Sequence, residues 1–230
     1  IGNKGIIYYT ITRGTIPIFS VDAWRMLDKE TGYIKVSRFA EKTHEEFLKA
    51  FEELKKQELK NLILDLRGNP GGYLSTAIAL TDEFLDDRKL IVYTQGRTKP
   101  RAEYESERPG VFEQGKLIVL VDEGSASASE ILSGAMQDWD RGIIVGRRSF
   151  GKGLVQKPYM MPDSSMVRIT TARYYTPSGR CIQKPYEEGT DAYRAELAER
   201  FKHGEYMHSD SIKMPDSLKY YTNKQRLVYG

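Results

Sequence analysis

The stretch NLILDLRGNPGGYLSTAIALTDEFL, residues 61–85, carries the pattern that decides the fold class. Its first six residues form a short apolar run, which is typical of a strand buried on both faces of a sheet. The turn residues of RGNPGG then interrupt the chain, and YLSTAIALTDEFL follows with the pattern of a helix. A buried strand, a glycine-rich turn and a helix in succession predict an α/β architecture.

The same alternation continues on both sides of this stretch. A helix is predicted from residue 43, where Thr43 and Glu46 match a capping box and the apolar residues that follow share one face. Residues 95–115 are predicted to be a polar loop, and from about Gln183 the chain turns polar and charged around one further helix. The other elements predicted are strands at 6–13, 90–94, 116–122, 142–146 and 165–176, and helices at 125–139 and 190–202.

Composition excludes several classes of protein. A chain of 230 residues, 40% hydrophobic and 29% charged, suits one large globular domain or one domain with an appendage. The net charge of +3 is spread over many residues of both signs, which argues against a nucleic-acid partner. No apolar run is long enough for a membrane span. The single cysteine, Cys181, excludes an internal disulfide and a cysteine metal cluster.

The segment DEGSASASEI, residues 122–131, contains the first candidate for chemistry. Ser127 and Glu130 match the S-x-x-E capping box, so the simplest interpretation of Ser127 is a helix cap. A serine at a strand-to-helix turn also projects from the edge of a sheet. There the amide of Ala128, at the helix N-terminus, can face a developing oxyanion. A serine hydroxyl is a poor nucleophile unless a base takes its proton, so this interpretation requires a partner.

Lysine is the remaining candidate for that base. His44, His203 and His208 are all expected on the solvated surface, and no pattern of histidines or acidic residues predicts a metal site. Lys152 lies between two glycines, which allow close backbone approach, and is flanked by apolar residues. A lysine base working near neutrality needs its pKa brought down from about 10.4 towards roughly 7–8, which burial favours.

The segment around Lys152 also permits a different interpretation. VGRRSFGKGLVQ, residues 145–156, nearly matches the phosphate-binding loop G-x-x-x-x-G-K-[ST]. The hydroxyl that would hold Mg²⁺ is replaced by Gly153. Pro158 argues against the helix that such a loop should open. A nucleotide-binding protein is therefore kept as the weaker alternative.

Three blocks of the sequence resemble one family. DLRGNPGGYLSTAIALTDEFL, VDEGSASASEI and VGRRSFGKGLVQ occur in the order found in the carboxy-terminal processing proteases, also called tail-specific proteases, peptidase family S41. The resemblance extends from about Ile16 to Gln183, and YYTPSGRCIQ (174–183) resembles the family's strand and turn after the active site. It implies a crotonase- or ClpP-like layered β-β-α core without a cofactor or metal.

The resemblance also implies residue roles. By it, Ser127 is the nucleophile of a serine–lysine endopeptidase and Lys152, 25 positions later, is the general base. Gln156 matches the glutamine that orients the lysine, although the chain must bend at Gly153 for the two side chains to meet. The oxyanion hole is expected from the backbone amides of Ala128 and of Gly71 or Gly72. RGNPGG, which holds the last two, is equally typical of an ordinary tight turn.

The resemblance further implies a domain organisation and a partner. Residues 1–15 are expected to be the last strand and connector of a PDZ domain, residues 16–183 the protease core, and residues 184–230 a C-terminal extension. The expected substrate is a protein or peptide with a free C-terminus, and the expected location is the periplasm or cell envelope of a bacterium. A protease-like fold that binds peptides without cleaving them remains a further alternative.

Overall fold

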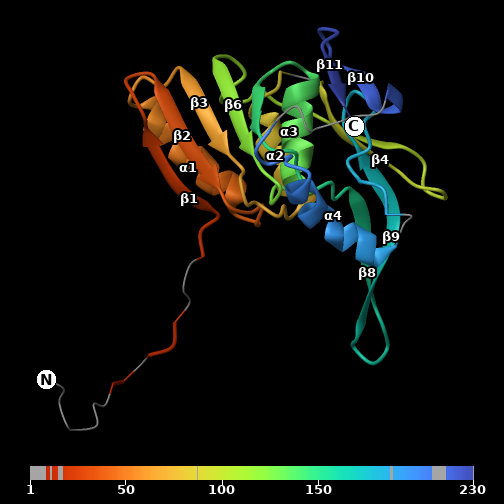
Figure 1. Cartoon of the computed structure of the whole chain (residues 1–230). Helices are drawn as coiled ribbons and strands as arrows, with labels where there is room; N and C mark the ends of the chain where they lie inside the picture. The colour runs from red at the N-terminus through yellow and green to blue at the C-terminus, as the bar shows by residue number, and fades with distance from the viewer. Residues whose placement is uncertain are drawn as a thin grey trace, which may run out of the picture.

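A computed structural model describes residues 9–10, 12–14, 18–86, 88–186, 189–208 and 216–229 of the chain. Its elements alternate between strands and helices, which confirms the predicted α/β class (Figure 1). They are β1 Val21–Met26, β2 Thr31–Val36, α1 Thr43–Lys55, β3 Asn61–Asp65, α2 Leu74–Asp82, β4 Leu90–Gln95, β5 Ala102–Glu105, β6 Lys116–Val121, α3 Ala128–Asp138, β7 Ile143–Gly146, β8 Leu154–Met160, β9 Met166–Tyr175, α4 Thr190–Lys202, η2 Asp216–Leu218, β10 Lys219–Tyr221 and β11 Leu227–Tyr229.

The larger sheet has five strands in the order β1-β2-β3-β6-β7. Strands β2, β3, β6 and β7 are parallel, and β1 closes one edge as the antiparallel arm of a hairpin with β2. Register pairs Leu64 of β3 with Ile34 of β2 and with Val119 of β6, and all three side chains are buried. Because parallel strands present their carboxyl ends at one edge, the loops after β3 and β6 lie side by side there.

The second sheet is antiparallel, with the order β5-β4-β9-β8. Its strands β8 and β9 form a long hairpin that projects from the body of the molecule (Figure 1). Strand β5 lies in the region predicted to be a polar loop, so that prediction is wrong for residues 102–105. An edge strand with exposed polar side chains gives no hydrophobic signal, which explains why the pattern does not reveal it.

Helices and strands both contribute to the hydrophobic core. Helix α1 packs on β1 and β2, and α2 and α3 pack on each other and contact β4 of the second sheet (Figure 1). The apolar face predicted for α1 is confirmed, since Phe47, Ala50, Phe51 and Leu54 are all buried. Among the residues that the structure describes, no helix is long and apolar enough to cross a membrane.

Two predictions about the first part of the chain differ from the structure. Helix α1 has Lys42 at its N-cap without a side-chain cap bond. Glu46 instead accepts hydrogen bonds from Ser20 N at 2.7 Å and Val21 N at 3.1 Å, so the predicted Thr43–Glu46 capping box is wrong. Half of the strand predicted at residues 6–13 lies outside the described residues, and the described positions 9, 10, 12 and 13 belong to no strand.

Candidate active site

Ser127 lies at the N-cap of α3, in the loop that follows β6. Its backbone has φ 56° and ψ −110°, a conformation that residues with a side chain rarely adopt. Such a conformation costs about 1–3 kcal/mol and persists only where the surroundings impose it. The side chain is half-buried, so the hydroxyl is presented at a turn whose geometry the fold enforces.

The loop around Ser127 is held by the loop that follows β3. Ala126 N donates to the carbonyl oxygen of Asn69 at 3.0 Å, and Ser129 Oγ donates to the same oxygen at 3.0 Å. Ser125 Oγ donates to the carbonyl oxygen of Leu66 at 2.8 Å. Asn69 is fully buried and its Nδ2 donates to the Val36 carbonyl oxygen at 2.9 Å, which ties both loops to the end of β2.

Asp65 anchors the loop after β3 from its other end. The carboxylate is fully buried and accepts hydrogen bonds from Arg67 N at 2.9 Å, Arg67 Nη2 at 2.7 Å and Tyr33 Oη at 2.7 Å. Burial alone would raise the pKa of this carboxyl, but the hydrogen bonds from Arg67 and Tyr33 outweigh it and lower the pKa to about 2. Asp65 is therefore ionised across the physiological range and fixes the start of the RGNPGG turn.

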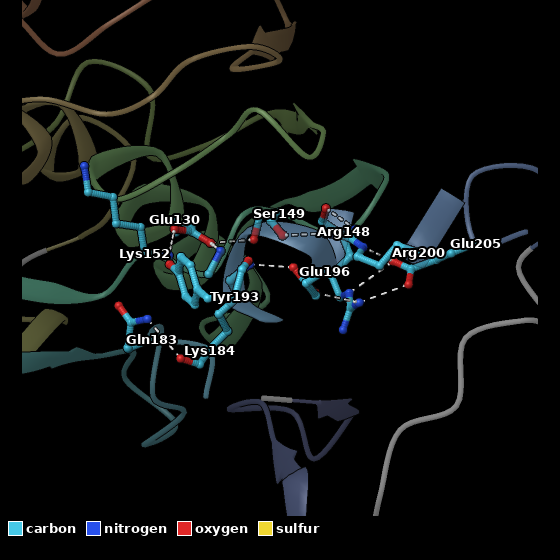
Figure 2. Close-up of polar contacts among 11 residues, drawn as sticks. Glu130, Arg148, Ser149, Lys152, Gln183, Lys184, Tyr193, Glu196, Arg200 and Glu205 are labelled. Atoms are coloured by element: carbon cyan, nitrogen blue, oxygen red, sulfur yellow. Dashed lines mark hydrogen bonds and ion pairs between the residues drawn. The ribbon is translucent and has the colours of Figure 1, made fainter. Parts of the chain in front are cut away.

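Glu130 joins the Ser127 turn to the segment that carries Lys152. It is almost fully buried, and its Oε2 accepts hydrogen bonds from Ser127 N at 2.7 Å and Lys152 N at 2.9 Å. Its Oε1 accepts from Ser149 Oγ at 2.7 Å and Gly151 N at 2.6 Å (Figure 2). Burial raises the pKa of the Glu130 carboxyl, and these four donors oppose that rise. The sequence predicts only the contact to the Ser127 turn, because the other partners lie about 20 residues further along the chain.

Lys152 lies beside this carboxylate with its side chain turned outward. The backbone nitrogens of Ser127 and Lys152 are within two hydrogen-bond lengths of each other, since both donate to the same oxygen. The side chain of Lys152 extends away from Glu130 (Figure 2) and is exposed, contrary to the burial that the apolar neighbours predicted. Within the described residues, its ammonium group has no hydrogen-bond partner, Ser127 included.

A strand follows Lys152 directly. Strand β8 begins at Leu154, so the glycine-rich segment opens no helix and cannot present a helix N-terminus to a phosphate. Gln156 lies in β8 with an exposed side chain that bonds to no other described residue. The pairing of β8 with β9 is irregular between Val155 and Gln156.

The glycines of RGNPGG approach Ser127 closely. Gly71 has φ +94°, and a Cβ built on it would lie 2.8 Å from Ser127 Cβ and 2.9 Å from Ala128 N. Its own N–H, however, donates to Asn69 Oδ1 at 2.9 Å. The N–H groups of Gly72 and Ala128 have no acceptor among the residues that the structure describes. Of the three candidate amides, those of Gly72 and Ala128 are therefore available to an oxyanion.

The histidines are distributed nearly as predicted. His203 and His208 are exposed. His44 is not fully solvated as expected, because its Nε2 lies 2.7 Å from Glu83 Oε1 and its side chain is only 20% exposed. None of the three contacts Ser127 or Lys152 in the described part of the chain.

The chain is similar to known proteins of one family. A family model described as peptidase family S41 matches residues 30–191. A carboxy-terminal-processing protease of Bartonella bacilliformis is 41% identical over 162 residues, which are 68% of this chain and 37% of that protein. The carboxy-terminal processing protease CtpB of Bacillus subtilis is 34% identical over 231 residues, which are 100% of this chain and 46% of that protein.

A solved structure shares both sequence and fold with the chain. It is a photosystem II D1 C-terminal processing protease, 34% identical with a TM-score of 0.66, matched over 75% of this chain and 47% of that one. The chain therefore spans less than half the length of each of these three proteins.

Proposed function

Because the chain belongs to peptidase family S41, we propose that it is a serine endopeptidase with a Ser127–Lys152 dyad, acting near the C-termini of proteins or peptides. The observation that carries the proposal is the shared carboxylate of Glu130, which holds the backbones of Ser127 and Lys152 together at the N-terminus of α3. The names of the relatives support the substrate class.

In the proposed reaction, Ser127 Oγ attacks the carbonyl carbon of the scissile peptide bond while the free amine of Lys152 accepts the hydroxyl proton. The tetrahedral intermediate collapses as the C–N bond breaks, and the leaving amine takes the proton back from Lys152. Water then attacks the resulting serine ester and loses a proton to Lys152. The ester C–O bond breaks as Ser127 Oγ takes that proton back from Lys152, and the new C-terminal acid is released. For the first step the exposed Lys152 side chain has to rotate inward to the Ser127 hydroxyl.

The proposed oxyanion hole consists of the Ala128 and Gly72 amides. Both N–H groups lack an acceptor among the described residues, whereas the Gly71 amide is engaged by Asn69. Of the two glycines that the sequence leaves open, Gly72 is therefore proposed in place of Gly71. Donors that are held before the reaction stabilise the oxyanion without reorganising during it.

Other expectations from the resemblance remain parts of the proposal. Gln156 is proposed to orient Lys152 once the lysine turns inward, and the core is proposed to have crotonase-like layering. The proposed division is a PDZ-like segment at 1–15, a core at 16–183 and an extension at 184–230, and the proposed location is the bacterial periplasm or envelope. No cofactor is required by this chemistry.

The experiment combines cleavage with active-site labelling. The chain should cleave an extended peptide with a free C-terminus and react with a fluorophosphonate probe at Ser127. Ser127→Ala should abolish both, and so should Lys152→Ala. Lys152→Arg should fail too, because a guanidinium does not give up its proton. Full activity in Lys152→Ala would contradict the dyad, and labelling at a different residue would contradict the nucleophile.

A peptide-binding protein without turnover is the second candidate. The outward side chain of Lys152, which has no contact with Ser127, favours it. In that case the wild-type chain and Ser127→Ala should bind the same peptide equally, and the probe should label neither.

A further inference from the structure

The segment that carries the proposed base is contacted by a helix far along the chain. Residues 147–152, here called the lysine loop, run from the end of β7 to Lys152. Helix α4, Thr190–Lys202, and the turn after it lie against this loop (Figure 2). The sequence predicts α4 only as part of a polar extension, with no relation to the site.

Arg200 of α4 makes the most direct of these contacts. Its side chain is only 4% exposed. Nη2 donates to the carbonyl oxygen of Arg148 at 2.7 Å, and Nη1 donates to that of Ser149 at 3.3 Å. Nε donates to Glu205 Oε1 at 2.7 Å, so the buried positive charge is paired. The guanidinium therefore binds two consecutive carbonyl groups of the lysine loop from one fixed position.

The ion pairs around Arg200 alternate in sign and include the lysine loop. Glu205 also accepts from Arg148 Nε at 3.1 Å and Nη2 at 3.0 Å. Arg148 Nη2 reaches Glu196 at 3.2 Å, and Glu196 accepts from Lys184 Nζ at 2.5 Å. Each charge in the series faces one of opposite sign, so the network holds the loop without leaving a charge unpaired.

The loop residues that Arg200 binds are in turn connected to the site. Ser149, whose carbonyl oxygen faces Arg200, donates its hydroxyl to Glu130 Oε1 at 2.7 Å. The other oxygen of Glu130 accepts the N–H groups of Ser127 and Lys152. A continuous chain of hydrogen bonds therefore runs from α4 to the nucleophile turn.

We propose that Arg200 is a positioning residue for Lys152, a role that rests on the proposed function. By fixing the carbonyl groups of Arg148 and Ser149 it sets the path of the lysine loop, and with it the point from which the Lys152 side chain swings towards Ser127. Arg200 itself touches neither substrate nor the reacting atoms. An arginine suits this task because its planar fork of donors serves two carbonyl groups and a carboxylate at once.

The first test needs no catalysis. Hydrogen–deuterium exchange is measured on wild type, Arg200→Ala and the control Lys202→Ala. Lys202 lies on the same helix in an exposed ion pair with Glu199. In Arg200→Ala the lysine-loop amides should exchange about tenfold faster while β3 is unchanged, because the loop opens locally. Lys202→Ala should exchange as wild type does.

The second test separates positioning from substrate binding. Arg200→Ala should lower kcat about 100-fold, the size of effect expected from a small misplacement of a catalytic group. KM should stay within about twofold, and fluorophosphonate labelling of Ser127 should slow in parallel with kcat. Arg200→Lys should recover only part of the rate, because an ammonium cannot reach both carbonyl groups and Glu205 together.

The outcomes are distinguishable. If Arg200→Ala exchanges at the lysine loop like wild type, or keeps wild-type kcat, the positioning role is wrong. If Arg200→Ala does not fold, Arg200→Lys decides in its place by the same two readouts, with unchanged loop exchange overturning the role. If the wild-type chain neither cleaves nor labels at Ser127, the proposed function fails, while the exchange experiment still decides whether Arg200 holds the loop.

Discussion

Replacing Glu130 by glutamine keeps the shape of the side chain but exchanges one acceptor oxygen for an amide group. In the wild-type protein, each oxygen of the Glu130 carboxylate accepts two hydrogen bonds, and only one of the four donors is a hydroxyl. In the orientation of lower energy, the glutamine side chain places its amide nitrogen at the Oε1 position. There the Ser149 hydroxyl can rotate and accept a hydrogen bond from it. Gly151 N then faces a donor and loses its bond.

The loss of stability in Glu130→Gln can be estimated from these hydrogen bonds. An unsatisfied N–H in this setting costs about 1–3 kcal/mol, and each surviving bond weakens by about 1 kcal/mol when its acceptor becomes neutral. Because glutamine is neutral, the cost of burying a charge at this position disappears, which offsets part of the lost stability. We expect Glu130→Gln to lower the free energy of unfolding by about 2–4 kcal/mol, and to lower kcat as well because both Ser127 N and Lys152 N lose a charged acceptor.

The assay is urea unfolding followed by tryptophan fluorescence at pH 8, a basic pH chosen because burial raises the pKa of the Glu130 carboxyl. Ser149→Ala serves as the control, since it removes one donor from the same oxygen and should cost about 1 kcal/mol. A Glu130→Gln protein within about 0.5 kcal/mol of wild type, with unchanged kcat, would refute the idea that the shared carboxylate holds the two segments together.

Three further predictions concern other parts of the molecule. The pKa of Asp65 is about 2 against 3.8 in the unfolded chain, so its contribution of about 2 kcal/mol is complete above pH 3.8 and is lost as the pH falls through 2. Urea midpoints at pH 5 and pH 2 should therefore differ more in wild type than in Asp65→Asn, and equal differences would contradict this. Gly71→Ala should abolish turnover, because its Cβ would lie 2.7 Å from the Ala126 carbonyl oxygen and would displace the Ser127 turn. Gly68→Ala, which also has positive φ but faces open space, should cost only about 1 kcal/mol and leave kcat unchanged. Equal losses of kcat in the two glycine variants would show that backbone strain, not the close approach, is responsible. Finally, millimolar ATP or GTP with Mg²⁺ should leave the melting temperature unchanged, and a clear rise would revive the phosphate-loop alternative.

The central layer of the fold could be predicted because its signals are local. The apolar runs at 61–66 and 116–122 correspond to β3 and β6, and the helix predicted at 125–139 corresponds to α3, Ala128–Asp138. Strand β1 could not be predicted, because its signal is absent. Four consecutive residues of β1 are exposed, so the strand has neither an apolar run nor an alternating pattern.

The site was predictable as a set of residue types but not as a geometry. Ser127 and Lys152 stand out from their local sequence, and their backbones do meet at one carboxylate oxygen. Glu130 could be predicted only as a cap, and Arg200 only as a surface cation, because their partners in the other segments lie 19 to 52 residues away in the sequence. The direction of the Lys152 side chain depends on a rotamer, which no sequence pattern encodes.

The positive φ of Ser127 means that stability and catalysis favour different residues at this position. A glycine there would adopt φ 56° without strain, so Ser127→Gly would relieve a conformational cost of about 1–3 kcal/mol while removing the hydroxyl. Mutational drift under selection for stability alone would favour that replacement. A library of this protein screened only for thermal resistance should therefore accumulate glycine at position 127, and the serine should persist only where turnover is also selected.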